Sequence, residues 1–192
     1  MGRNGYAHTK RSTRAQPTLV LVMGVAASGK TTLSKHILKD FRATYLDNNF
    51  VVDAFYPDTR MGTEYFKFRP NFYAVLYRIT EENLVLGNSV LLDVPHIKEV
   101  QQSEWRTRII KLTAETHAKL VVLRCICSEQ TLKQRIIARG ESRDAWKLDN
   151  WDDFLKEQPI AVPVPFDHFD INTESDVSAN AELAIQYILR HH

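Results

Sequence analysis

The chain has little cysteine: Cys125 and Cys127 are the two thiols among its 192 residues. Two cysteines cannot supply the ligand set of a structural zinc site or a disulfide framework. Their i, i+2 spacing within an apolar stretch places both side chains on one face of an expected strand. We therefore interpret both as core residues in a reducing compartment.

A long hydrophobic run is also missing. No apolar stretch approaches the ~20 residues that a membrane-spanning helix needs, and the N-terminal segment lacks the apolar core of a signal peptide. The sequence thus predicts a cytoplasmic protein with no membrane partner. Its 192 residues, 44% of them hydrophobic, fit a single α/β domain with a core of its own.

The chain also lacks a large excess of charge of either sign, since its formal net charge is +2. Residues 1–17 contain four of the 25 basic residues and no acid, which leaves 21 basic against 23 acidic residues in the rest. A body that is not basic disfavours a general nucleic-acid surface, whereas the basic tail leaves contact with RNA or DNA open. We expect residues 1–16 to be a disordered basic tail and residues 17–192 to form the folded domain.

Residues 24–31 carry the strongest motif of the chain. They read Gly-Val-Ala-Ala-Ser-Gly-Lys-Thr, the complete G-x-x-x-x-G-K-[ST] pattern of a phosphate-binding loop. The apolar residues 19–23 before it predict a strand, and residues 32–38 after it have the apolar spacing of a helix. This context is the one that the motif requires, so the sequence predicts a nucleoside triphosphate with Mg²⁺ as the ligand.

Each part of this loop has an expected role. Gly24 and Gly29 allow positive φ angles, so that successive backbone N–H groups can point at the phosphates. Lys30 is expected to bridge the β- and γ-phosphates as a catalytic cation, and the Thr31 hydroxyl to bind Mg²⁺. The predicted nucleotide-binding residues of the loop are Gly24, Ala26, Ala27, Ser28, Gly29, Lys30, Thr31 and Thr32.

Strand-like and helix-like segments alternate along the rest of the chain. Further strands are expected at residues 43–46, 89–92, 120–126 and 168–171. Helices are expected at residues 30–41, 71–87, 99–117, 128–139 and 176–190. The alternation predicts βαβ units and a mainly parallel sheet, with ligands at the carboxyl ends of the strands. The Pro-rich residues 159–166 are expected to run extended into the last strand.

Two carboxylates follow expected strands. Asp93 ends the apolar run 90–92, and beside a phosphate-binding loop this pattern predicts a Mg²⁺ ligand, although a simple strand-end turn is the alternative. Asp47 follows the second strand, where a carboxylate can accept the proton of an attacking hydroxyl. Asp47 can instead form an Asx turn or a helix N-cap.

A basic segment at residues 132–147 predicts a lid over the phosphates. Arg135 and Arg139 are four residues apart and share one helix face, and Gly140 separates them from Arg143. Phosphoryl transfer depends on cations placed against the transferred group, so we expect a catalytic arginine among these three. The alternative is a solvated basic face whose charges pair with neighbouring acids.

Aromatic residues concentrate between positions 50 and 77, which hold nine of the sixteen Phe and Tyr residues. The same stretch holds Arg60, Lys67 and Arg69. An acceptor pocket lined by rings and a few cations, or a small core under a mobile subdomain, explains this concentration. Asp53 and Asp58 in the same stretch are candidates for acceptor binding or plain surface residues. We interpret Trp146 and Trp151 as packing anchors and expect His96 to be exposed in its loop.

With these motifs, residues 19–188 resemble the P-loop small-molecule kinases of the nucleoside- and nucleotide-kinase-like group, including AAA family ATPases and zeta-toxin-like kinases. The resemblance implies a three-layer P-loop NTPase fold with a five-stranded sheet in the order 2-3-1-4-5, flanking helices and a helical lid. It also implies ATP as donor and transfer of the γ-phosphoryl group to a hydroxyl or phosphate of a small-molecule acceptor. Arg135, Asn172 and Thr173 would then contact the nucleotide, the last two near adenine.

Other functions remain open at this stage. The sequence has neither the N-K-x-D guanine motif of a GTPase nor the L-S-G-G-Q signature of a transporter ATPase. A regulatory module that hydrolyses ATP slowly and a polynucleotide 5′-hydroxyl kinase are the alternatives to a small-molecule kinase. Asp47 and the lid arginines favour transfer, because a switch needs no base on the acceptor side.

Overall fold

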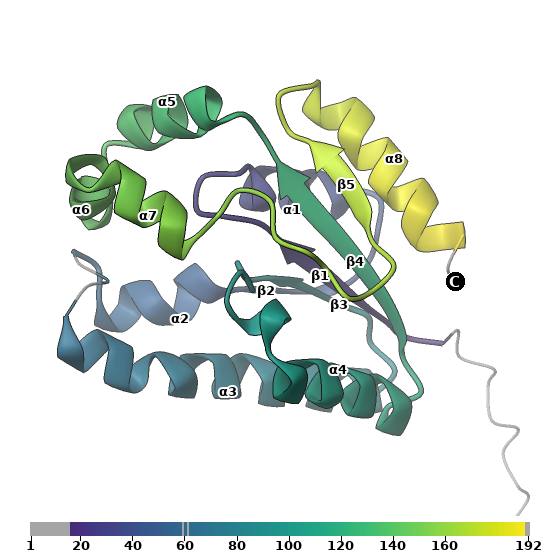
Figure 1. Ribbon diagram of the computed structural model, residues 1–192. Helices are drawn as coiled ribbons and strands as arrows, with labels where there is room; N and C mark the ends of the chain where they lie inside the picture. The colour runs from purple at the N-terminus through teal and green to yellow at the C-terminus, as the bar shows by residue number, and fades with distance from the viewer. Residues whose placement is uncertain (1–15, 59, 61, 191–192) are drawn as a thin grey trace, which may run out of the picture.

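The computed structural model describes residues 16–58, 60 and 62–190, and the expected basic tail at residues 1–16 lies almost wholly outside this range. Five parallel strands form one sheet in the order β2-β3-β1-β4-β5 (Figure 1). They are β1 (Thr18–Met23), β2 (Thr44–Asp47), β3 (Val90–Asp93), β4 (Lys119–Ile126) and β5 (Phe169–Asn172). The predicted sheet order is confirmed, and every predicted strand is present within one residue at each end.

The central strand β1 is buried along its whole length, as its unbroken apolar sequence requires. It pairs with β3 on one side and with β4 on the other, so its side chains alternate between two cores. Leu19, Leu21 and Met23 contribute to one core, and Val20 and Val22 to the other. This arrangement fixes the phosphate-binding loop, which leaves the carboxyl end of β1, at the middle of the sheet.

Helices cover both faces of the sheet and form a three-layer domain (Figure 1). The α-helices are α1 (Lys30–Ile37), α2 (Asn48–Phe55), α3 (Thr63–Val85), α4 (Ser103–Glu115), α5 (Glu129–Arg139), α6 (Ala145–Asp149), α7 (Trp151–Glu157) and α8 (Val177–Arg190), and the 3-10 turns are η1 (Glu99–Gln101) and η2 (Ser142–Asp144). Helices α3 and α4 pack on the core that contains Leu19, whereas α1 and α8 pack on the core that contains Val20. Among the described residues, no helix is both long enough and apolar enough to cross a bilayer.

The lid has a small core of its own. Leu132 and Ile136 of α5 cluster with Trp151 and Phe154 of α7, and with Val25 of the phosphate-binding loop. Gly140 ends α5 in the left-handed conformation at φ 63°, so the expected break of the helix is present. The shared core therefore attaches the lid directly to the loop that it covers.

Several elements differ from expectation. Helix α3 begins at Thr63 instead of residue 71 and contains Pro70, whose missing N–H costs one hydrogen bond that the packed helix tolerates. The short helices α2, α6 and α7 were not predicted, because each is shorter than the window in which helical periodicity can be read. Residues 159–166 have no helix or strand, as expected.

We expect Ile109→Ala to lower the free energy of unfolding by about 2–5 kcal/mol, because a buried side chain is replaced by a cavity. Ile109 of α4 is fully buried against the sheet. Ile110→Ala on the same helix is the matched control, since that side chain is 56% exposed. Urea unfolding measures both variants, and equal losses would contradict the described packing of α4.

Candidate active site

The phosphate-binding loop has the backbone conformation that its glycines make possible. Gly24 has φ 143° and Gly29 has φ 92°, and Ala27 between them also takes a positive φ of 64°. A Cβ atom on Gly24 would lie 2.6 Å from both the Cys125 carbonyl oxygen and Ser28 Oγ. Both the positive φ angle and the lack of room for a Cβ atom therefore require glycine at position 24.

Lys30 is folded back onto this loop. Its Nζ donates to the carbonyl oxygens of Gly24 and Val25, both at 2.9 Å. Burial lowers the pKa of Lys30, and the carboxylate of Asp93 acts in the opposite direction. The side chain is thus a buried cation whose donors are occupied by backbone carbonyls that a phosphate can replace.

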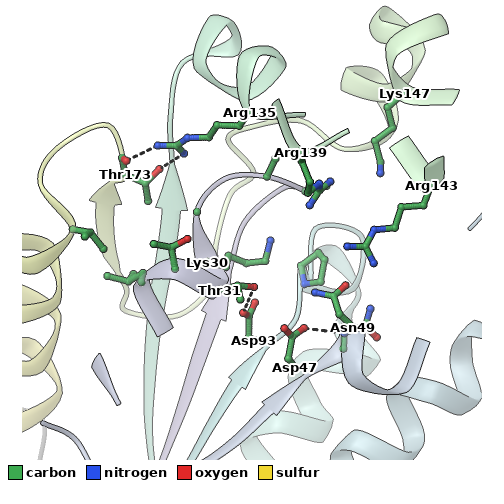
Figure 2. A pocket seen from close by; sticks show the side chains of 18 of the residues that line it. Lys30, Thr31, Asp47, Asn49, Asp93, Arg135, Arg139, Arg143, Lys147 and Thr173 are labelled. Carbon is green, nitrogen blue, oxygen red and sulfur yellow. Dashed lines mark hydrogen bonds between the residues drawn. The ribbon is translucent and has the colours of Figure 1, made fainter. Parts of the chain in front are cut away.

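Asp47 and Asp93 lie side by side at the carboxyl ends of β2 and β3, where the strand register pairs their Cα atoms. The Thr31 hydroxyl donates to Asp93 Oδ2 at 2.7 Å. The Tyr45 hydroxyl lies 3.1 Å from the same oxygen and 3.2 Å from Asp47 Oδ2. Figure 2 shows both carboxylates below Lys30 at the floor of the cavity.

The electrostatics of this pair follow from its burial. Burial and the neighbouring Asp47 raise the pKa of Asp93 to about 6, although Lys30 and Thr31 favour the charged form. Burial and both carboxylates raise the pKa of the Tyr45 hydroxyl, so it stays protonated. One hydroxyl proton serves one carboxylate at a time.

Asp47 forms the helix N-cap that the sequence offered as one of its alternatives, and its side chain also faces the main cavity. Its Oδ1 accepts from the backbone N–H of Asn49 at 2.8 Å and caps α2. Its Oδ2 lies toward Tyr45, and the side chain lines the main cavity although only 4% of the residue is exposed. The cap holds the carboxylate in place without using both of its oxygens.

The lid cations reach the cavity from the opposite side (Figure 2). Arg135 donates to the carbonyl oxygen and the hydroxyl of Thr173, at 2.6 and 2.9 Å. Arg139 and Lys147 share the carboxylate of Asp144, which is 1% exposed. Burial raises the pKa of Asp144, but the hydrogen bond from Lys147 and the charge of Arg139 outweigh it and hold the pKa below its ordinary value.

Arg143 joins the lid to α2. Its Nη1 bonds to Asp53 Oδ1, which also accepts from Arg60, and its Nε lies 3.4 Å from Glu141. Arg60 donates to Asn49 Oδ1 at 2.8 Å as well. Asp53, which the sequence left between acceptor binding and plain exposure, thus connects the lid to the helix that Asp47 caps.

Two adjoining cavities lie between the sheet edge and the lid. The main cavity has a volume of about 710 Å³. Its lining includes the predicted residues Ala26, Ala27, Gly29, Lys30, Thr31, Thr32, Asp47, Asp93, Arg135, Arg139, Arg143 and Thr173. A smaller cavity of about 190 Å³ lies on the α3 side. The two share Ala26, Asn48, Arg60, Pro95, Arg143 and Lys147.

Three predicted residues do not line the main cavity. Gly24 and Ser28 belong to the loop but lie under its surface, and Ser28 is fully buried. Asn172 is exposed, and its side chain accepts from the backbone N–H of Glu174 at 3.0 Å. Thr173, next to it, lines the cavity because its hydroxyl turns inward to Ser28 and Arg135.

Two other site residues, Tyr45 and Asn180, were not singled out from the sequence, whereas Arg60 and Lys147 lie in the segments predicted to form the acceptor pocket and the lid. Tyr45 could have been found, since it precedes Asp47 by two residues in a strand and therefore shares its face. Asn180 gave no such signal, because tertiary packing alone brings it to the cavity. The expectation for His96 was wrong: it is 1% exposed, bonds Tyr77 at 2.7 Å, and burial lowers its pKa to about 3.

The aromatic segment contributes both to a small core and to the wall of a cavity. Tyr65 and Phe72 form a small core with Val52 of α2. Tyr65, Phe66 and Tyr73 also line the smaller cavity, together with Trp146 of the lid. Trp151 is a packing anchor, as expected, whereas Trp146 has an additional cavity-facing position.

We compared the sequence and the fold of this chain with those of known proteins. No curated protein matches the sequence. A proposed kinase from Chloroflexus aurantiacus superposes with a TM-score of 0.70 at 21% identity, over 92% of this chain and 98% of its own. A sugar kinase from Janibacter sp. gives 0.64 at 16% identity, over 90% and 94%.

The APS kinase CysC of Mycobacterium tuberculosis, solved with AMPPNP and APS, gives a TM-score of 0.60 at 16% identity, over 91% of this chain and 98% of its own. At these identities the likeness shows a shared fold, that of the P-loop kinases. The family model described as an AAA domain matches residues 19–158. The chain therefore belongs to the AAA domain family of P-loop proteins.

Proposed function

We propose that the protein is an ATP- and Mg²⁺-dependent kinase that transfers the γ-phosphoryl group to a hydroxyl of a small molecule. The observation that carries this proposal is the position of Asp47 and Asp93, which are paired on the adjacent strands β2 and β3. Both line the main cavity, which adjoins a second, smaller cavity. A site for ATP binding alone needs one of these carboxylates. Two carboxylates facing the same cavity suit a metal ligand and a base for the acceptor.

The donor set beside Lys30 fits Mg²⁺. Thr31 Oγ1 and Asp93 Oδ2 are hard oxygen ligands 2.7 Å apart, and the buried Asp93 carboxylate gains a counter-charge when the ion is present. The described residues contain no cluster of three His, Cys, Asp or Glu side chains at metal-binding spacing. This composition matches an ion that takes its remaining ligands from phosphate and water. When bound, Mg²⁺ neutralises charge on the phosphates.

The lysine and the lid arginines surround the expected position of the transferred group. Lys30 reaches it from the loop, and Arg139 and Arg143 reach it from the lid (Figure 2). Asp144, Asp53 and the loop carbonyls hold these cations, so contacts within the protein position them. Positive charge held in place in this way is a main source of the rate enhancement in phosphoryl transfer. Arg135, fixed by Thr173, is proposed to contact the nucleotide.

Asp47 is proposed as the general base. Asp47 lines the main cavity, and Asn48, which follows it in the chain, lines both cavities. An acceptor hydroxyl there can donate its proton to Asp47 while its oxygen attacks the γ-phosphorus. APS kinase, which shares the fold, was solved with a nucleotide analogue and its small-molecule acceptor together, and this supports a two-substrate site of the same kind.

We expect Asp47→Asn to keep nucleotide affinity within about twofold while lowering kcat for transfer by about 100-fold or more. Asparagine is as good an N-cap as aspartate, so the substitution removes the charge and spares α2. Calorimetry with AMPPNP and Mg²⁺ measures affinity. Transfer of labelled γ-phosphate is measured for a panel of sugars, nucleosides, aminoglycosides, nucleotides and 5′-hydroxyl oligonucleotides.

The exposed Asp40 provides the matched control, because Asp40→Asn removes the same charge away from both cavities. Full transfer activity in Asp47→Asn would show that Asp47 serves only as a helix cap. Labelling of oligonucleotides in place of small molecules would instead favour a polynucleotide kinase. ATP hydrolysis without any transfer would favour the regulatory ATPase.

The raised pKa of Asp93 predicts that the free energy of unfolding depends on pH when a chelator keeps the protein free of metal. This pKa is about 6 in the folded state against an ordinary 3.8, so unfolding between these pH values releases a proton. The contribution of Asp93 to the free energy of unfolding therefore falls as pH rises from about 4 to about 6, by roughly 2–3 kcal/mol. Asp93→Asn, measured by urea unfolding at each pH, should gain on the wild type by this amount. A difference that stays constant with pH would rule the shifted pKa out.

A further inference from the structure

The smaller cavity has a near end and a far end. The near end is the set of residues that it shares with the main cavity, including Asn48 and Arg143. The far end is lined by Arg69 and Tyr73 of α3, by Ile97 and by Lys98, none of which lines the main cavity. A molecule in this cavity can therefore present one end to the phosphate-binding loop and the other to α3.

The cavity is small. Its volume is about 190 Å³, against about 710 Å³ for the main cavity. The rings of Tyr65, Tyr73 and Trp146 form part of its wall. These limits suit a compact molecule of a few carbons.

Positive charge dominates the wall. The cationic lining residues are Arg60, Arg69, Lys98, Arg143 and Lys147. Glu157 is the sole acid among the described lining residues, and it is half exposed and paired with Lys98 at 2.9 Å. The acids that pair with the other cations, namely Asp53, Glu99, Glu141 and Asp144, do not line the cavity. A molecule inside thus meets mainly N–H donors, and Glu157 is the one carboxylate among the described residues of the wall.

Arg69 is held at the far end by contacts with two side chains. Its Nη2 lies 2.7 Å from Glu99 Oε1 and donates to the Tyr73 hydroxyl at 2.9 Å. Its guanidinium carbon lies 4.7 Å from the centroid of the Tyr73 ring. Both of these polar contacts use Nη2, one of the nitrogens that carry the five N–H donors of a guanidinium. A buried acid and a ring thus fix the group at the wall of the cavity, where a planar guanidinium suits an anionic ligand.

Resting on the proposed kinase function, we propose that the smaller cavity binds the acceptor and that the acceptor is a compact hydroxylated molecule with an anionic group, a carboxylate or a phosphate monoester, bound by Arg69. The acceptor hydroxyl lies at the near end, beside Asp47. Its oxygen forms a bond to the γ-phosphorus as the bond from that phosphorus to the bridging oxygen of ADP breaks. The hydroxyl proton passes to Asp47, and ADP leaves with the electron pair of the broken bond.

The test compares matched neutral and anionic probes: glycerol, glycerate and glycerol 3-phosphate, and ribose, ribonate and ribose 5-phosphate. Calorimetry is carried out on protein saturated with AMPPNP and Mg²⁺, so that the phosphate-binding loop is already filled. We expect an anionic member of a series to bind at least about tenfold more tightly than its neutral member. The carboxylate and phosphate members separate the two possible anionic groups.

Arg69→Met should weaken binding of the anionic probe by about 10- to 100-fold, because a charge-assisted hydrogen bond is lost. Affinity for AMPPNP should stay unchanged. Arg78→Met is the matched control: Arg78 is nine residues further along α3, on the opposite face, and its side chain is 70% exposed. Arg69→Met combined with Glu99→Gln avoids leaving a buried acid unpaired and keeps the test valid where the single variant unfolds.

Three results would overturn the anionic acceptor: equal binding of neutral and anionic probes, unchanged anion binding in both Arg69 variants, or no binding of any anionic probe. Each leaves the proposed kinase function standing if labelled phosphate is still transferred to a neutral acceptor. Failure of the wild type to bind AMPPNP with Mg²⁺ would instead overturn the kinase function itself. The two proposals therefore fail on different measurements.

Discussion

The strand register that sets Asp47 beside Asp93 is the constraint on which the rest of the site depends. Both strands are parallel and end at the same edge of the sheet, so both carboxylates arrive where the phosphate-binding loop leaves β1. A shift of one residue in either strand would turn one of them into the core on the opposite face. The apolar residues of β3 prevent that shift because all of them are buried. Core packing thus holds two acids together that would otherwise repel each other.

The lid depends on a second kind of constraint, the sharing of acids between cations. Asp144 holds Arg139 and Lys147, and Asp53 holds Arg60 and Arg143. Because each acid serves two cations, part of the positive charge remains available to phosphate. The cations are also linked across elements that lie far apart in sequence. The lid and α2 therefore form one electrostatic unit around the cavities.

Much of the fold and the donor half of the site could be read from the sequence. The loop at residues 24–31 has fixed spacing, and the alternation of strands and helices determines which residues reach the carboxyl edge of the sheet. Asp47 and Asp93 were found this way. The acceptor half could be located in residues 50–77 but not resolved, because Arg69 reaches its cavity through a helix that begins eight residues earlier than its periodicity indicates. Asn180 has no local pattern at all, and the burial of His96 depends on contacts with α3.

The bonds between Lys30 and its own loop carbonyls have a consequence for selectivity among anions. The carbonyl oxygens of Gly24 and Val25 accept from Lys30 Nζ, so an anion that binds this lysine competes with acceptors of the protein itself. A lone inorganic anion offers few contacts in exchange, whereas a polyphosphate engages the loop N–H groups, Lys30 and the lid at once. This internal competition therefore favours chelating ligands over simple anions.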